Sequence, residues 1–278
     1  MPVEENQSAL ELFRAATSVP DAQIDLLECA LLIAQAEYRD LDRSAYRRRL
    51  DEMGREAAGV CTDCAVAERL GQLSRLFSGR WGFHGNRDAY YDPRNSFLND
   101  VLDRRTGIPI TLSVVYMEVG RRAGMDLVGV GMPSHFLVGY RGRDDVYVDA
   151  FSEGALLARA DCAARLRELR PDVVFRPELL EPVGPRVILT RMLNNLVDIY
   201  LRNGRFPKAL EAVEIILCLQ PGQPEWLRHR ALLNSQLKNY SRAIADLESY
   251  LERAPEAADR EEMVKHLTIL RMLRSSVN

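Results

Sequence analysis

Apolar residues recur at helical spacing through the first part of the chain. In residues 24–38, Leu26, Ala30, Ile33 and Ala36 are three or four positions apart, as they would be on one face of a helix. Residues 44–57 and 64–77 repeat this pattern with polar residues between the apolar ones. We therefore expect residues 8–78 to be helical. The Gly- and aromatic-rich stretch that follows, 78–96, is too irregular for a long element.

A second helix pattern begins after residue 106 and is apolar on nearly every face, which predicts a buried helix. Its main apolar stripe consists of Ile108, Leu112, Val115 and Val119. Thr106 is the expected N-cap, Pro109 fits the first turn and Gly124 ends the pattern. Further upstream, residues 90–94 are typical of a turn, and Asn95 directly follows them. We expect Asn95 to cap the short helix that carries Phe97, Leu98 and Val101.

The pattern then changes from helical to strand periodicity. Residues 134–140 and 145–151 alternate apolar and polar positions and are separated by a polar turn, which predicts a hairpin. If the turn is centred on Gly142, His135 is directly opposite Asp149 and Phe136 is opposite Val148. Opposed side chains have Cβ atoms roughly 5 Å apart, so the imidazole and the carboxylate could form a hydrogen bond. A polar cross-strand pair of this kind also occurs in proteins without any chemistry.

The last third of the chain contains two copies of a 34-residue pattern, residues 191–224 and 225–258. Three pairs of residues are separated by this period: Phe206 and Tyr240, Ala209 and Ala243, and Pro221 and Pro255. This is the period of tetratricopeptide repeats, which are pairs of helices. The prolines before residue 186 predict a boundary, giving domains 1–185 and 186–278, with residues 260–273 as a capping helix. The repeats could brace the first domain or bind a partner.

Composition narrows the classes of function. The net charge of −3 provides no basic field for nucleic acid or anionic lipid. The acidic N-terminus lacks a signal-peptide core, and no apolar run is long enough for a membrane span. Five cysteines without a secretory signal argue against disulfides, and the single CxxC of Cys61 and Cys64 lacks companion ligands. We expect a cytoplasmic protein without cofactor or metal.

The run of residues 90–140, "YYDPRNSFLNDVLDRRTGIPITLSVVYMEVGRRAGMDLVGVGMPSHFLVGY", resembles the bacterial SirB-type proteins. These join a transglutaminase-like core, a papain-related fold with a Cys-His-Asp triad, to C-terminal tetratricopeptide repeats. The resemblance implies an α+β core with N-terminal helices, followed by an all-α repeat domain. By motif, His135 and Asp149 take the His and Asp positions of the triad. The position of the catalytic cysteine falls at Pro109, and no cysteine is found between Cys64 and Cys162.

Two hypotheses follow for the function. In the first, the chain is a pseudoenzyme that binds a protein or peptide through a cleft at the residual dyad and through its repeats. In the second, it is an acyl-transfer, deamidase or amide hydrolase enzyme that uses a substitute nucleophile with His135 as base. Thr111 is a weak candidate nucleophile, Ser113 another, and Cys61 or Cys64 would have to fold over the site.

Nucleic-acid binding is a third and less favoured class. Four arginines surround the predicted central helix, but acidic residues are interleaved with them, which is typical of a solvated rim. The arginines are Arg104, Arg105, Arg121 and Arg122, and the acidic residues are Asp100, Asp103, Glu118 and Asp126.

Overall fold

The computed structural model describes residues 8–61 and 64–277. Residues 1–7, which hold part of the acidic N-terminal stretch, are outside this range. The chain divides into two compact units, residues 1–192 and 193–278. The first unit therefore includes the beginning of the helix that starts at Pro185, the residue at which the sequence predicts the boundary.

The first unit begins with a layer of helices, as the apolar spacing predicts for residues 8–78. Side chains cap three of them: Ser8, Asp25 and Asp42 each accept a backbone N–H from the first turn. The helices are α1 (Ala9–Ala16), α2 (Leu26–Gln35), α3 (Arg43–Val60) and α4 (Val66–Ser74), and a π-helical turn continues α4 over Arg75–Arg80.

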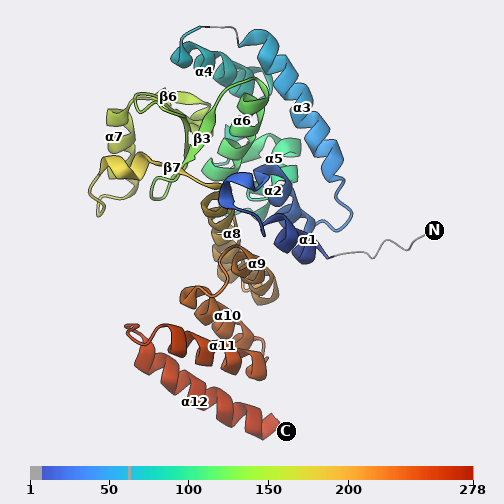
Figure 1. The fold of residues 1–278 in the computed structure, drawn as a ribbon, viewed down its shortest axis with the longest axis vertical. Coiled ribbons are helices and arrows are strands. Elements are labelled where there is room, and N and C mark those ends of the chain that lie inside the picture. The colour runs from blue at the N-terminus through green and yellow to red at the C-terminus, as the bar shows by residue number, and fades with distance from the viewer. Residues whose placement is uncertain (1–7, 62–63, 278) are drawn as a thin grey trace, which may run out of the picture. The chain divides into compact units, whose positions relative to one another are not determined.

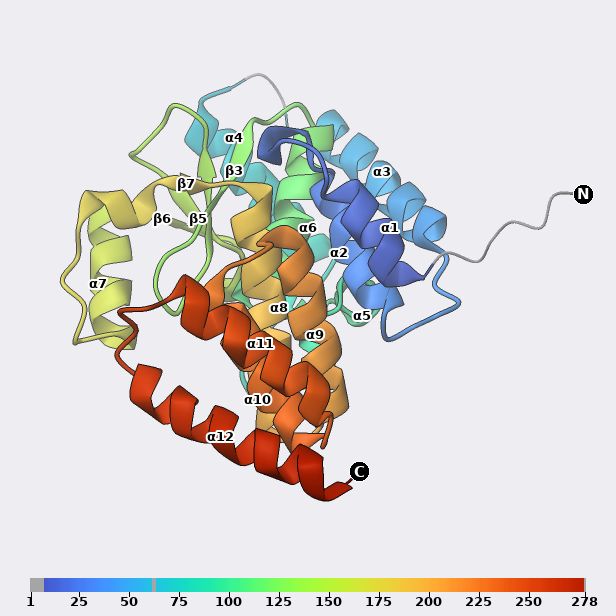
Figure 2. The same ribbon diagram turned by 60° about the horizontal axis from the view of Figure 1, so that its bottom comes forward.

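The central element of this unit is α6 (Pro109–Arg122), in which every residue from Pro109 to Gly120 is buried. Figures 1 and 2 both show α6 between the helices α2, α3 and α5 (Leu98–Arg104) on one side and the strands on the other. Pro109 is the first helical residue, as predicted. The prediction for Thr106 is wrong: the N-cap is Ile108, and Thr106 belongs to strand β2 (Thr106–Gly107).

A two-stranded parallel sheet connects the irregular segment 78–96 to the start of α6. It pairs β1 (His84–Gly85) with β2. A side chain at position 85 would collide with both the ring and the carbonyl of Phe151, so the glycine permits this close approach. The segment that looks structureless in the sequence is therefore packed against the end of the main sheet.

The main sheet has five strands in the order β6-β5-β4-β3-β7, all antiparallel. Its strands are β3 (Leu127–Val130), β4 (Leu137–Tyr140), β5 (Tyr147–Asp149), β6 (Ala155–Leu157) and β7 (Pro182–Val183). The predicted hairpin of β4 and β5 exists, but its register differs from the prediction by two residues: Val138 pairs with Val148, and Gly139 with Tyr147. Because side chains alternate with period two, a shift of two keeps every residue on its predicted face.

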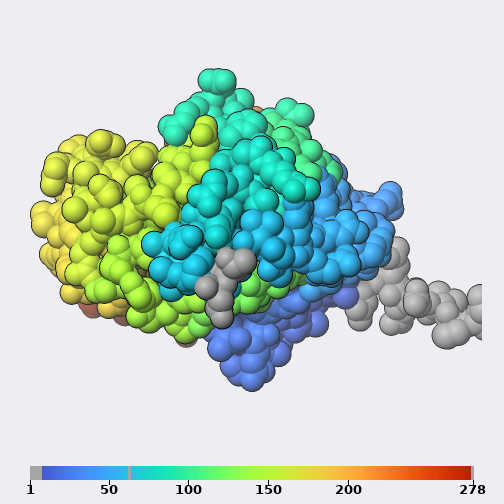
Figure 3. All heavy atoms as spheres, turned by 90° about the horizontal axis from the view of Figure 1, so that it is seen from above, coloured from blue at the N-terminus to red at the C-terminus, as the bar shows by residue number. Residues whose placement is uncertain are grey.

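Both faces of the hairpin are covered. Helix α7 (Arg159–Leu169) packs Cys162 and Leu166 against Leu137 and Tyr147 in a buried cluster. Next to the edge strand β6, buried Gly154 is close to Ser74 at the end of α4, and a side chain at Gly71 would meet Leu156 of β6. Figure 3 shows the cyan atoms of the α4 region beside the yellow-green atoms of the strand region. Helix α7 thus covers one face of the sheet, α6 packs against β3 and β4, and α4 packs against the edge strand β6.

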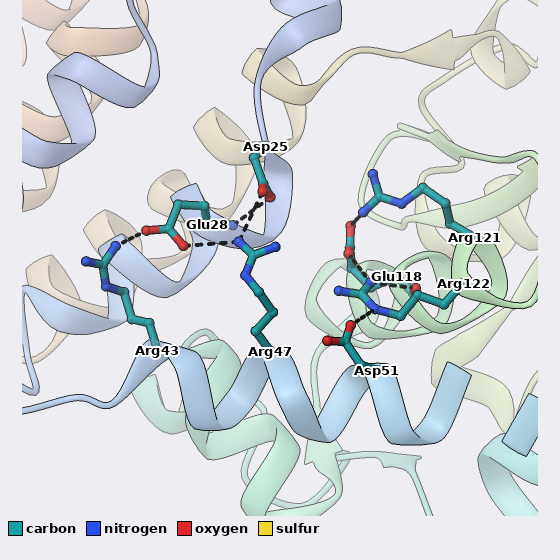
Figure 4. A network of polar contacts seen from close by, with 8 residues as sticks. All are labelled: Asp25, Glu28, Arg43, Arg47, Asp51, Glu118, Arg121 and Arg122. Atoms are coloured by element: carbon teal, nitrogen blue, oxygen red, sulfur yellow. Dashed lines mark hydrogen bonds and ion pairs between the residues drawn. The ribbon is translucent and has the colours of Figure 1, made fainter. Parts of the chain in front are cut away.

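Charged side chains join α2, α3 and the C-terminal half of α6 (Figure 4). Glu28 of α2 pairs with Arg43 and Arg47 of α3, and Arg47 also reaches Asp25 at 3.0 Å. Further along the same face of α3, Asp51 pairs with Arg122 of α6 at 2.6 Å. Arg122 and Arg121 in turn hold the carboxylate of Glu118, which is 2% exposed.

The second unit is all helical. Its helices are the remainder of α8 (Pro185–Arg202), then α9 (Phe206–Leu219), α10 (Pro224–Gln236), α11 (Tyr240–Arg253) and α12 (Arg260–Val277). Ala209 and Ala243, separated by the 34-residue period, are both fully buried. Small side chains at these positions let neighbouring helices pack closely. None of the described helices of either unit is long and apolar enough to cross a membrane.

Candidate functional site

The structure brings the predicted His and Asp together. His135 immediately precedes β4, and Asp149 is the last residue of β5. The imidazole Nε2 is 3.0 Å from the carboxylate Oδ2, and the two side chains are 5% and 0% exposed. The distance is that of an ion pair, although the N–H direction departs from a straight hydrogen bond. We refer to this pair as the dyad.

Asp149 is held from its other oxygen. Its Oδ1 accepts the backbone N–H groups of Phe151 and Ser152, both at 3.1 Å, at the start of the 3₁₀ turn Ala150–Ser152. Burial raises the pKa of Asp149, but the contact with His135 and the hydrogen bonds from Ser152 outweigh it, so the pKa is below its ordinary value. The carboxylate is therefore ionised at neutral pH and fixed in orientation.

His135 reaches Asp149 from a turn, not from the directly opposed strand position that the sequence predicts. In the observed register the residue opposite Asp149 would be Leu137, the first residue of β4. Ser134 has a left-handed backbone with φ of +57°, and the N–H of His135 donates to the carbonyl of Met132 at 3.1 Å. A non-glycine residue in this conformation costs about 1 kcal/mol or more. The strained backbone of Ser134 is thus next to His135, in the turn that orients its imidazole.

The start of α6 presents no nucleophilic side chain. Pro109 is its first residue, and it contributes neither an N–H nor a reactive atom. The hydroxyl of Thr111 donates to the carbonyl of Asn95 at 2.7 Å and accepts the N–H of Ile108 at 3.2 Å. Ser113 Oγ is 3.5 Å from the carbonyl of Phe136. Both hydroxyls are fully buried, and their hydrogen bonds go to the backbone.

The cysteines provide no replacement at the dyad. None of the five cysteines forms a disulfide within the described residues. Cys61 ends α3 and Cys64 is 4.0 Å from the amide oxygen of Gln72 in α4. Burial raises the pKa of Cys61, which is the opposite of an activated thiolate. Cys162 is in the core behind the sheet, where burial raises its pKa to about 12.

Asn95 has a different position from the helix cap that the sequence predicts. The N-cap of α5 is Phe97, whereas Asn95 ends a 3₁₀ turn and is completely buried. Its amide donates to the carbonyls of Ala89 and Tyr90, at 2.7 and 3.2 Å. The backbone carbonyl of Asn95 accepts a hydrogen bond from the hydroxyl of Thr111. Asn95 therefore connects the irregular segment to the start of α6.

An aromatic ring beside the dyad is in contact with this segment. Phe151, directly after the dyad strand, has its ring centroid 6.3 Å from that of His135 and 6.2 Å from that of Tyr90. The guanidinium of Arg87 lies over the ring of Phe151, 5.0 Å from its centroid. The sequence-based reasoning missed Arg87 and Tyr90 because irregular segments carry no periodicity.

Two further arginines approach the dyad from helices. Arg191 of α8 donates to the carbonyls of Met132 and His135, at 2.9 and 2.8 Å, and lies 5.4 Å from the ring of Phe136. Arg165 of α7 has a guanidinium nitrogen 3.8 Å from Oδ2 of Asp149. Both were missed in the sequence, where Arg191 is simply the first residue of a repeat.

The four arginines around α6 that suggested a basic patch are partnered instead by acidic side chains or by an aromatic ring. Arg121 and Arg122 pair with Glu118, and Arg104 is 3.5 Å from Asp92. Arg105 lies over the ring of Phe83, 5.0 Å from its centroid. Elsewhere in residues 8–61 and 64–277, no three His, Cys, Asp or Glu side chains gather as metal ligands would.

Comparison with known proteins agrees with this architecture. The Transglutaminase-like superfamily matches residues 44–194, and a Tetratricopeptide repeat family matches residues 196–268. The class of protein is thus a transglutaminase-like domain followed by tetratricopeptide helices.

Relatives over nearly the full length define the family more closely. A UPF0162 protein of Xylella fastidiosa is 36% identical over 95% of this chain and 96% of its own length. One from Vibrio cholerae is 29% identical over 91% of this chain and 89% of its own. The human F-box only protein 21 is 32% identical over 54% of this chain, which is 25% of that protein. The chain belongs to the transglutaminase-like superfamily, among the bacterial SirB-type proteins of the UPF0162 family.

Proposed function

We propose that this protein is a non-catalytic member of its superfamily that binds a protein or peptide through the residues around the dyad and through its helical repeats. The observation that carries the proposal is Pro109 at the start of the central helix, where the resemblance puts the catalytic cysteine. A pyrrolidine ring cannot form the covalent acyl intermediate on which thiol chemistry depends.

The surroundings of the dyad support a binding role. Exposed or partly exposed aromatic and arginine side chains, such as Tyr90, Arg87 and Arg191, are typical of protein-binding surfaces. The matched tetratricopeptide helices belong to a repeat class that commonly provides such surfaces. We propose that the protein acts in the bacterial cytoplasm, where the thiols of a chain with five cysteines stay reduced.

The enzyme hypothesis with Thr111 as nucleophile receives less support. Its hydroxyl is committed to a carbonyl at 2.7 Å and is fully buried, so His135 would have to compete with that hydrogen bond to activate it. We therefore propose that His135 and Asp149 belong to a binding site and do not act in catalysis.

The test pairs a chemical assay with a binding assay on the full chain. Amine incorporation, deamidation and amide hydrolysis are followed by mass spectrometry on a mixed peptide library, with wild type and His135→Ala. We expect rates at background for both proteins, and library peptides retained by the wild type that His135→Ala or Phe151→Ala retains less well. Turnover that His135→Ala abolishes would make the protein an enzyme. Equal retention by all three proteins would remove the dyad from the binding site.

A further inference from the structure

The charges around the dyad do not balance. Three arginines approach it from three different elements: Arg87 from the segment after β1, Arg165 from α7 and Arg191 from α8. We call them the arginine cluster. The acidic group in contact with this cluster is Asp149, which is already engaged by His135 and by two backbone N–H groups.

Arg191 is the member whose charge is least compensated. Both of its hydrogen bonds go to neutral carbonyls, and within residues 8–61 and 64–277 it forms no ion pair. Burial lowers the pKa of Arg191, while Tyr90 acts in the opposite direction. A guanidinium nevertheless stays protonated in proteins, so its desolvation is a cost that an anion could offset.

Arg87 is similarly without a carboxylate. It lies over the ring of Phe151 and is 3.4 Å from the hydroxyl of Ser152, and it has no ion pair in the described part of the chain. Two acidic residues are adjacent in the chain, Asp88 to Arg87 and Glu153 to Ser152. Both are exposed, and neither forms an ion pair with the cluster in the described residues. The ion pair of Arg165 in the described residues is the 3.8 Å contact with Asp149.

Two of the arginines are linked to the dyad through shared neighbours. The ring of Phe151 connects Arg87, Tyr90 and His135, and the carbonyl of His135 accepts from Arg191. Carboxylates match the planar donor pattern of a guanidinium, and aromatic walls exclude water from such a contact. A neutral glutamine side chain would leave the same arginines without a counter-charge.

We infer that the arginine cluster and the aromatic residues beside the dyad form a recognition site for a carboxylate of a peptide, a glutamate or aspartate side chain. This inference rests on the proposed function, because it names the chemistry of the segment bound there. It predicts selection for the acid over its amide, whereas a transglutaminase acts on glutamine.

The test compares two capped tripeptides, acetyl-Ala-Glu-Ala-amide and acetyl-Ala-Gln-Ala-amide, which differ only in charge. Dissociation constants are measured by NMR titration of the full-length protein, following the side-chain signals of His135 and of the arginines. We expect the glutamate peptide to bind about tenfold tighter, as for one charge-assisted contact. The preference should disappear in Arg191→Gln and shrink in Arg87→Gln. Arg141→Gln is the matched control. Arg141 is on the exposed hairpin turn and pairs with Asp126, so this variant should keep the full preference.

The outcomes separate the two proposals. Equal binding of both peptides, or a preference that persists in Arg191→Gln, would overturn carboxylate recognition while leaving peptide binding at the dyad intact. Binding of neither peptide, with no change in the His135 signals at millimolar concentration, would count against both. Circular dichroism of each variant shows whether a lost preference reflects a lost fold.

Discussion

The two ends of helix α6 handle buried charge in opposite ways. Near its C-terminal end, the carboxylate of Glu118 is 2% exposed and each of its oxygens has an arginine, one of which is also held by Asp51. Near its N-terminal end, Arg191 donates to two carbonyls and Arg87 contacts a ring and a hydroxyl, and neither forms an ion pair within the described residues. Charges that serve the fold are paired within the chain. Charges left without a counter-charge cost stability, and a ligand can recover that cost.

The largest effect should come from breaking the paired end. Glu118→Ala removes the carboxylate that both Arg121 and Arg122 contact, and should lower the free energy of unfolding by about 3 kcal/mol. This is the lower limit of the usual range, because Arg121 is 60% exposed and can return to water. Urea denaturation measures it. A loss below about 1 kcal/mol would put this network in the same class as surface ion pairs.

The next effect concerns how closely α3 approaches the same end of α6. A Cβ at Gly54 would collide with the Cβ of Arg122, whereas a Cβ at Gly59 on the same helix would meet open space. Gly54→Ala should cost about 1–3 kcal/mol by overpacking, although alanine is the better helix former. Gly59→Ala should gain up to about 1 kcal/mol. Equal effects in thermal unfolding would show that the two helices do not pack as closely as described.

At the site end, the lowered pKa of Asp149 predicts a pH dependence with a definite sign. A carboxylate with a folded pKa below its unfolded value contributes stability above about pH 4, and that contribution is lost as the pH falls through the folded pKa. The stability difference between wild type and Asp149→Asn should therefore shrink on acidification from neutral pH. Urea unfolding at a series of pH values measures it. A constant difference would mean that His135 does not stabilise the ionised form.

The smallest effect on stability should be that of Arg191→Gln. Glutamine is two bonds shorter and gives up the hydrogen bonds to Met132 and His135, but the substitution also removes a charge that has no counter-charge within the described residues, so the two effects oppose each other. We expect the free energy of unfolding to change by less than about 1 kcal/mol. A loss as large as that of Glu118→Ala would show that Arg191 serves the fold, and the contrast between the two ends of α6 would fail.

The sequence predicts the helices of the molecule correctly but not the register of its hairpin. The helices of residues 8–78, the buried α6 and the repeat helices follow from apolar spacing, because burial of one face requires that spacing. The hairpin register does not follow. A shift of two residues preserves both faces, so the apolar pattern cannot distinguish the predicted pairing from the observed one, in which Val138 faces Val148.

Side chains that depend on tertiary contacts were beyond prediction for a related reason. Asn95 follows a turn signal typical of a cap, but its amide instead holds the carbonyls of Ala89 and Tyr90. Arg87 and Arg191 are about a hundred residues apart in the chain and meet only through Phe151 and His135. The hairpin pattern and the family resemblance both pointed to the His and Asp of the dyad, although the predicted register was wrong by two residues.

The most direct test of the central claim, that a proline occupies the nucleophile position beside the dyad, is the reactivity of Pro109→Cys. Its alkylation rate with iodoacetamide is measured against pH, with the wild type to correct for the native cysteines and with Pro109→Cys/His135→Ala as the control. At about pH 6, where an ordinary thiol is almost fully protonated, we expect alkylation roughly tenfold faster than for such a thiol, and loss of that advantage in the control. An ordinary thiol profile that His135→Ala leaves unchanged would show that the start of α6 does not face the imidazole, and would contradict the account.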